Sequence, residues 1–144
     1  KMKITTTLDS KLTMYNADPK LAHIIFQNLI SNSVKYTPEK GNINVTIQKQ
    51  TPWLVIEVSD NGYGIPKSQQ SKIFSKLFRA DNVVTKDTDG TGLGLYLLKA
   101  IVVEAGGKIE FKSKENQGTT FTIHLPIKGM KSRSGTRGLS NVKS

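Results

Sequence analysis

Apolar residues recur along the chain with two different periods, which predict strands in some segments and helices in others. Alternation at every second residue predicts four strands, over residues 4–8, 12–15, 43–48 and 53–59. Further along, the same alternation predicts a hairpin formed by residues 108–113 and 119–126. A spacing of three to four residues predicts helices over residues 19–36, 67–74 and 93–105.

Capping and turn residues set the bounds of the two long helices. Asp18 precedes Pro19, which is an acceptor at the N-cap followed by proline at the first helical position. Thr37-Pro38 ends this helix, and Gly106-Gly107 ends the later one. Residues 79–92 lack periodicity and contain several Gly, Asp and Thr residues, so we expect a mobile loop there.

The order of these elements indicates the fold class. Strands and helices are mixed rather than strictly alternating, which favours an α+β fold over a doubly wound parallel sheet. We therefore expect a two-layer α/β sandwich, in which helices cover one face of a single sheet.

Composition limits the chain to a small globular domain. Its 144 residues suffice for one domain, 36% are hydrophobic, and there is no cysteine for a disulfide or a thiolate metal site. No apolar run approaches the roughly 18 residues of a membrane helix, and no signal-peptide pattern is present. Because the sequence opens on Lys1 rather than methionine, we expect it to be a piece of a longer protein.

The formal net charge of +10 raises the question of nucleic-acid binding. Half of this excess comes from residues 128–144, which carry five Lys or Arg residues and no acid. We expect a domain over residues 1–127 and a disordered basic tail over residues 128–144. The remaining cations suit a polyphosphate as well as a nucleic acid.

The first long helix carries polar side chains on one face. Asn28, Asn32 and Lys35 are spaced i, i+4, i+7. Amide oxygens are ligands for Mg²⁺, and lysine offers a positive charge to phosphate. A solvent-facing stripe is the alternative interpretation, and spacing alone does not exclude it.

An aspartate ends the strand over residues 53–59. Alternation places Asp60 on the same face as the apolar Leu54, Ile56 and Val58. Such a carboxylate needs a donor, which adenine offers in its exocyclic amine, whereas guanine presents an acceptor there. Glycines 62 and 64 remove side chains where a flat ring could approach the backbone. An ordinary turn after a strand is the alternative.

A glycine-rich turn opens the helix at residue 93. Gly90, Gly92 and Gly94 expose backbone N–H groups at a helix N-terminus, which is a phosphate-binding arrangement. A loop rather than a strand precedes the turn, which argues against a dinucleotide site.

The order of these motifs resembles the GHKL superfamily of ATPases and kinases, specifically the catalytic domain of sensor histidine kinases. Residues 26–37 (FQNLISNSVKYT) resemble the N box and 60–65 (DNGYGI) the G1 box. Residues 73–79 (IFSKLFR) resemble the F box, 89–95 (DGTGLGL) the G2 box and 118–121 (GTTF) the closing strand. The resemblance implies a Bergerat fold with about five strands in a mixed sheet, about three helices and a mobile ATP lid over residues 75–92.

The resemblance also implies roles for individual residues. Asn32 would bind Mg²⁺ with Asn28 nearby, and Lys35 and Tyr36 would reach the phosphates or the ribose of ATP. Asp60 would accept from the adenine amine. The other nucleotide-binding residues implied are Gly62, Gly64, Ile65, Lys76, Phe78, Arg79, Gly90, Thr91, Gly92, Leu93, Gly94, Leu95 and Thr119.

Asn28 separates a kinase from a hydrolase within this superfamily. Related ATPases carry a glutamate general base at this position, and an amide has no useful basicity. Transfer to a neutral imidazole needs positioning and charge neutralisation, for which Asn28, Lys35 and Arg79 are the catalytic candidates. We expect His23 and His124 to be structural, because neither is followed by an acidic residue.

The acceptor histidine is therefore expected on a dimerisation domain of the parent kinase, with a response regulator as an indirect partner. We expect the isolated domain to be monomeric and cytoplasmic, to belong to a membrane-bound sensor and to bind no nucleic acid. A nucleotide-binding pseudokinase and an anti-sigma-type serine kinase of the same fold are the alternatives.

Overall fold

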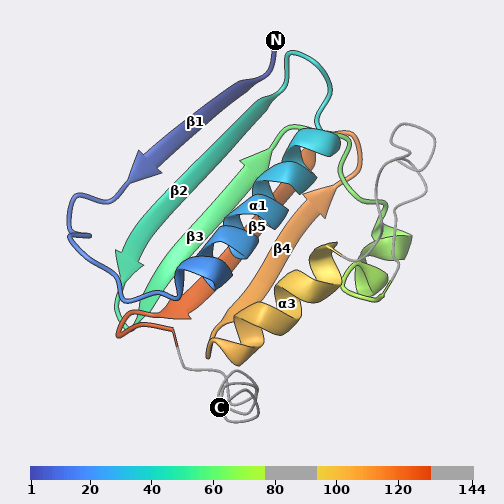
Figure 1. Cartoon of the computed structure of the whole chain (residues 1–144). Helices are drawn as coiled ribbons and strands as arrows, with labels where there is room; N and C mark the ends of the chain where they lie inside the picture. The colour runs from blue at the N-terminus through green and yellow to red at the C-terminus, as the bar shows by residue number, and fades with distance from the viewer. Residues whose placement is uncertain (77–93, 131–144) are drawn as a thin grey trace.

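The chain forms a five-stranded mixed sheet with helices across one face (Figure 1). The computed structural model describes residues 1–76 and 94–130. The strands are β1 (Lys3–Leu8), β2 (Asn42–Gln50), β3 (Trp53–Asp60), β4 (Lys108–Lys114) and β5 (Gly118–Pro126). The helices in the described residues are α1 (Pro19–Lys35), the 3-10 helix η1 (Lys67–Lys72) and α3 (Gly94–Glu104). This arrangement confirms the predicted two-layer α/β sandwich.

The order of the strands in the sheet is β1-β2-β3-β5-β4. β1 runs parallel to β2, and the remaining neighbours are antiparallel. Because β5 lies between β3 and β4, the last residue of β3 pairs with the start of β5, in the register Asp60 to Thr119. The strand-end acid is thereby placed beside the β4–β5 turn.

The core lies between the sheet and the two α-helices. α1 contributes a buried stripe at four-residue spacing, formed by Leu21, Ile25, Leu29 and Ser33. These side chains face alternate residues of the inner strands, among them Ile56 and Val58. Burying each large aliphatic side chain contributes about 1.5–3 kcal/mol, which holds α1 against the sheet and fixes its orientation.

Local signals set the ends of α1 as expected. The Asp18 side chain accepts a hydrogen bond from Lys20 N at 2.9 Å, and Pro19 is the first helical residue. At the other end Tyr36 N–H donates to Asn32 O at 3.1 Å. The polar residues of the second half of α1 are thus held at fixed positions relative to the sheet.

Two predicted elements differ from the structure. Residues 12–15 do not form a strand; they cross the end of the sheet, where the Tyr15 hydroxyl donates to Pro126 O at 2.8 Å. Leu12 and Tyr15, three residues apart, contact the buried cluster while Met14 is exposed, so the two-residue alternation of this segment does not match its burial. The helix predicted over residues 67–74 is a 3-10 helix over Lys67–Lys72.

The described fold also continues past residue 127, where the sequence predicted the tail to begin. Met130 packs against the core cluster, and its N–H donates to Asn16 O at 3.1 Å. The predicted loop over 79–92 and the rest of the tail, from residue 131, lie outside the described residues. Among the residues that are described, no helix has both the length and the apolar content needed to cross a membrane.

Candidate functional site

Asp60 projects from the end of β3 toward α1 and is partly buried. Its Oδ1 accepts hydrogen bonds from Gly62 N at 2.9 Å and from Thr119 N at 3.3 Å. Burial raises the pKa of the Asp60 carboxyl, whereas these two backbone donors and the nearby Ser33 hydroxyl act to lower that pKa. Asp60 is therefore a fixed acceptor in a poorly solvated place.

Glycines 62 and 64 make close backbone contacts within the protein. A Cβ at Gly62 would lie 2.1 Å from the Tyr36 carbonyl oxygen. One at Gly64, where φ is +68°, would lie 2.1 Å from the Lys114 carbonyl oxygen. From the sequence, these glycines were expected to leave room for a ligand. In the structure they leave room for the backbone of α1 and β4, which packs directly against them.

The loop after Asp60 is tied to the β4–β5 hairpin. Ser113 Oγ accepts from Ile65 N at 2.8 Å and lies 2.8 Å from Thr119 Oγ1. Gln70 Nε2 donates to the carbonyl oxygens of Ile65 and Ser113, both at 3.0 Å. Ile65 and Thr119, two predicted site residues, are thus joined through Ser113, which belongs to none of the sequence motifs.

On α1, the amide of Asn28 has a defined orientation. Its Nδ2 donates to Ile24 O at 2.8 Å, and this hydrogen bond distinguishes the amide nitrogen from the amide oxygen, Oδ1. That oxygen faces the start of α3, since a Cβ at Gly94 would lie 3.1 Å from Asn28 Oδ1. The N box and the end of the G2 box are therefore neighbours, as the resemblance implied.

The remaining α1 residues follow the same face. Asn32 is half-buried, and the Lys35 side chain is exposed. Asn28 and Asn32 carry amide oxygens, the type of ligand that a hard cation such as Mg²⁺ prefers. The described residues contain no cluster of three His, Cys, Asp or Glu side chains that could hold a metal ion.

The F box anchors the segment before residue 77. Ile73 is buried, and the Phe74 ring meets the rings of Phe111 and Phe121 edge-on, at centroid distances of 5.8 and 6.5 Å. Lys76 Nζ lies 5.8 Å from the centroid of the Tyr96 ring, which brings this predicted phosphate ligand next to α3. Leu95, at the start of α3, packs against the core.

Six predicted site residues cannot be placed relative to the others. They lie outside the described residues: Phe78, Arg79, Gly90, Thr91, Gly92 and Leu93.

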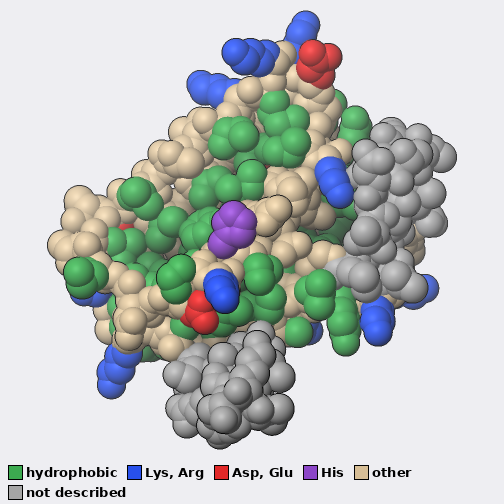
Figure 2. Space-filling view, viewed as in Figure 1, with side chains coloured by type: hydrophobic (Ala, Val, Ile, Leu, Met, Phe, Trp, Pro, Cys, Tyr) green, Lys and Arg blue, Asp and Glu red, His purple; other side chains and the backbone are tan. Residues whose placement is uncertain are grey.

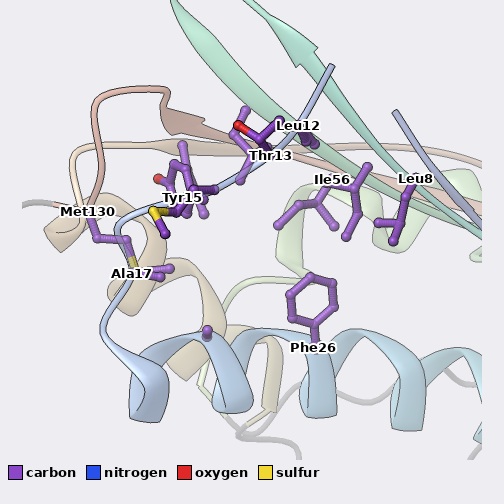
Figure 3. A pocket seen from close by; sticks show the side chains of 13 residues that line it. Leu8, Leu12, Thr13, Tyr15, Ala17, Phe26, Ile56 and Met130 are labelled. Atoms are coloured by element: carbon purple, nitrogen blue, oxygen red, sulfur yellow. The ribbon is translucent and has the colours of Figure 1, made fainter. Parts of the chain in front are cut away.

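A separate cavity of about 330 Å³ lies at the opposite end of β3 from Asp60 (Figure 3). Leu8, Leu12, Phe26 and Ile56 point into it, and no charged side chain lines it. A polyphosphate has no partner there, so this cavity is not the nucleotide site. On the helix-bearing side of the molecule, the described cationic side chains are scattered rather than gathered into one patch (Figure 2).

Comparisons with known proteins identify the family of the chain. The family model HATPase_c, described as histidine kinase-, DNA gyrase B- and HSP90-like ATPase, matches residues 17–129. The circadian input-output histidine kinase CikA of Synechococcus elongatus is 38% identical over 119 residues, which cover 83% of this chain and 16% of CikA. The chain therefore corresponds to a small part of this much longer relative.

Two solved structures share the fold. The catalytic domain of histidine kinase ThkA has a TM-score of 0.73 and 30% identity, covering 88% of this chain and 79% of that one. Full-length ShkA in complex with AMPPNP has a TM-score of 0.73 and 26% identity, covering 91% of this chain and 26% of ShkA. The family match, the sensor-kinase relative and these folds together show that the chain belongs to the HATPase_c family, as the catalytic domain of a sensor histidine kinase.

Proposed function

We propose that this domain binds Mg-ATP between α1, the end of β3 and the start of α3, and that it transfers the γ-phosphoryl group to a histidine on a separate dimerisation domain. The observation that supports this most directly is the arrangement around α1. Asp60, at the end of β3, lies beside Ser33 of the buried stripe of α1, and Asn28 on the polar face of the same helix lies next to Gly94 at the start of α3. The acid proposed to recognise the base thus lies against α1, and the amides proposed to bind the metal lie on that helix.

Asp60 selects the base in this proposal. A carboxylate held by Gly62 N and Thr119 N accepts from the exocyclic amine of adenine, and it repels the carbonyl oxygen that guanine carries at that position. Tyr36, Gly62, Gly64 and Ile65 form the surroundings of the base and the sugar.

The phosphates and the metal lie toward α3. Asn32 and Asn28 hold Mg²⁺ through their amide oxygens, and Lys35 contributes positive charge. Gly94 places the positive end of α3 beside them. The motif resemblance implies that Arg79 and the glycines at positions 90 and 92 contact the γ-phosphate end of ATP. ShkA, which shares the fold, was solved with an ATP analogue.

The acceptor is supplied by another domain. His124 belongs to the sheet face away from α1, because its neighbours Ile123 and Leu125 are buried on the helix face. There it packs against Trp53, with ring centroids 5.7 Å apart. His23 lies on the exposed side of α1. A response regulator then receives the phosphoryl group, and since ATP is a cytoplasmic substrate, we place the domain in the cytoplasm, attached to a membrane-bound sensor.

A transfer assay tests this function. The domain is incubated with γ-labelled ATP, Mg²⁺ and the histidine-bearing dimerisation domain of the parent kinase, and the labelled product is treated with acid. We expect acid-labile phosphate on the dimerisation domain, lost with Asn32→Ala. ATP binding without any transfer would identify a nucleotide-binding module, and acid-stable phosphate a serine kinase; either result contradicts the proposal.

A further inference from the structure

Ser33 occupies a position in α1 where an apolar side chain is expected. It continues the buried stripe of Leu21, Ile25 and Leu29 at four-residue spacing, and it is 0% exposed. A hydroxyl in such a place is unfavourable unless a partner compensates for its lost hydration. The fold alone gives no reason for a serine instead of an alanine.

The nearby polar group is the carboxyl of Asp60. Ser33 Oγ makes no hydrogen bond of normal geometry with a described residue. The carboxyl lies against the C-terminal end of α1, because a Cβ at Gly62 would lie 2.9 Å from Asp60 Oδ1 and 2.1 Å from the Tyr36 carbonyl oxygen. The Ser33 hydroxyl acts to lower the pKa of the carboxyl, in the same direction as the donors from Gly62 and Thr119. The hydroxyl hydrogen of Ser33 is free to turn about the Cβ–Oγ bond toward the carboxylate.

We propose that Ser33 is a positioning residue for base recognition: its hydroxyl donates to the Asp60 carboxylate and holds it toward the exocyclic amine of adenine. Three donors then fix the acid, from α1, from the loop after β3 and from the start of β5. The inference rests on the proposed function, since it assumes that adenine binds at Asp60. Ser33 would then belong to the nucleotide site, although it lies outside the polar face of α1 formed by Asn28, Asn32 and Lys35.

This arrangement has a consequence for specificity. α1 carries both the amides proposed to bind the metal and the hydroxyl that orients the base-selecting acid. Removing the hydroxyl leaves the metal end intact and loosens only the acid. The loss of nucleotide affinity should therefore depend on the amine of the base, whereas a loss caused by a general packing defect would not depend on it.

The test compares Ser33→Ala with wild type by calorimetric titration of two nucleotides, ATP and purine riboside triphosphate, whose base lacks the amine. We expect the variant to bind ATP about tenfold more weakly, as when one charge-assisted hydrogen bond is lost. Its affinity for the purine analogue should change by less than about twofold. Thermal unfolding of the variant checks that the fold is retained.

Ser59→Ala is the matched control. Ser59 adjoins Asp60 in β3 but points to the other face of the sheet, where its Oγ lies 2.7 Å from Thr120 Oγ1. This variant should bind both nucleotides as wild type does. If it shared the selective loss of ATP affinity, the effect would not belong to the Ser33 hydroxyl.

The remaining outcomes separate this inference from the proposed function. Equal losses for both nucleotides, or no loss, in Ser33→Ala would limit Ser33 to packing and overturn the inference alone. Equal affinities of the wild-type protein for ATP and the purine analogue would show that the amine is not recognised, and would overturn the assignment of Asp60 as well.

Discussion

Replacing Asp60 by asparagine tests the base-recognition site with little change in shape. The two side chains are nearly isosteric, and an amide oxygen in the place of Oδ1 still accepts from Gly62 N and Thr119 N. The amide nitrogen then takes the place of the second carboxylate oxygen. It presents two donors to the adenine amine, itself a donor, so the contact becomes repulsive.

The magnitude follows from the groups that change. Losing a hydrogen bond to a charged acceptor costs about 1.5–3 kcal/mol, and leaving a donor unpaired in a desolvated place costs about 1–3 kcal/mol more. At about 1.4 kcal/mol per factor of ten, the dissociation constant for ATP rises by roughly two to four orders of magnitude. Calorimetric titration with Mg-ATP at neutral pH measures this change directly.

Stability provides the control for this variant. Burial raises the Asp60 pKa above its usual 3.8, so the folded state holds the proton more tightly than the unfolded state does. Between 3.8 and that raised pKa, Asp60 makes the wild-type protein less stable as the pH rises, and asparagine removes this loss. Urea unfolding should show a variant at least as stable as wild type at neutral pH. Near-native ATP affinity in a folded Asp60→Asn protein would refute the assignment.

Three other substitutions test separate parts of the account. Asn28→Glu should leave folding intact and add slow ATP hydrolysis, measured as phosphate release, because it supplies a general base; loss of Mg-ATP binding would contradict this. Gly64→Ala should lower the unfolding free energy by more than about 2 kcal/mol in urea, because its Cβ would lie 2.1 Å from Lys114 O at a φ of +68°, and an unchanged value would refute the packing role. Asp18→Ala should cost about 1 kcal/mol of stability through the lost N-cap and leave the ATP dissociation constant unchanged, whereas a weaker affinity would tie the cap to the site.

Where local interactions determine the structure, the sequence was sufficient to predict it. Asp18 and Pro19 determine the start of α1 through the N-cap and the first helical position. The two-residue period of β3 correctly placed Asp60 on the face of Ile56 and Val58, because alternation does not depend on the strand's neighbours.

Other features depend on contacts between distant segments. Nothing in the local pattern indicates that β5 inserts between β3 and β4, although this insertion brings Thr119 to Asp60. Residues 12–15 alternate like a strand but lack a pairing partner, and Tyr15 bonds to Pro126 instead. Ser33 was missed because a single serine among helical apolar residues is unremarkable until its burial is known.

A calorimetric comparison of ATP and GTP, each with and without Mg²⁺, is the sharpest test of the proposed nucleotide site. We expect ATP to bind, Mg²⁺ to strengthen its binding, and GTP to bind at least about a hundredfold more weakly, because the base of GTP turns a carbonyl oxygen toward the Asp60 carboxylate. Equal affinities for the two nucleotides, or ATP binding indifferent to Mg²⁺, would contradict a site in which β3 selects the base and α1 binds the metal.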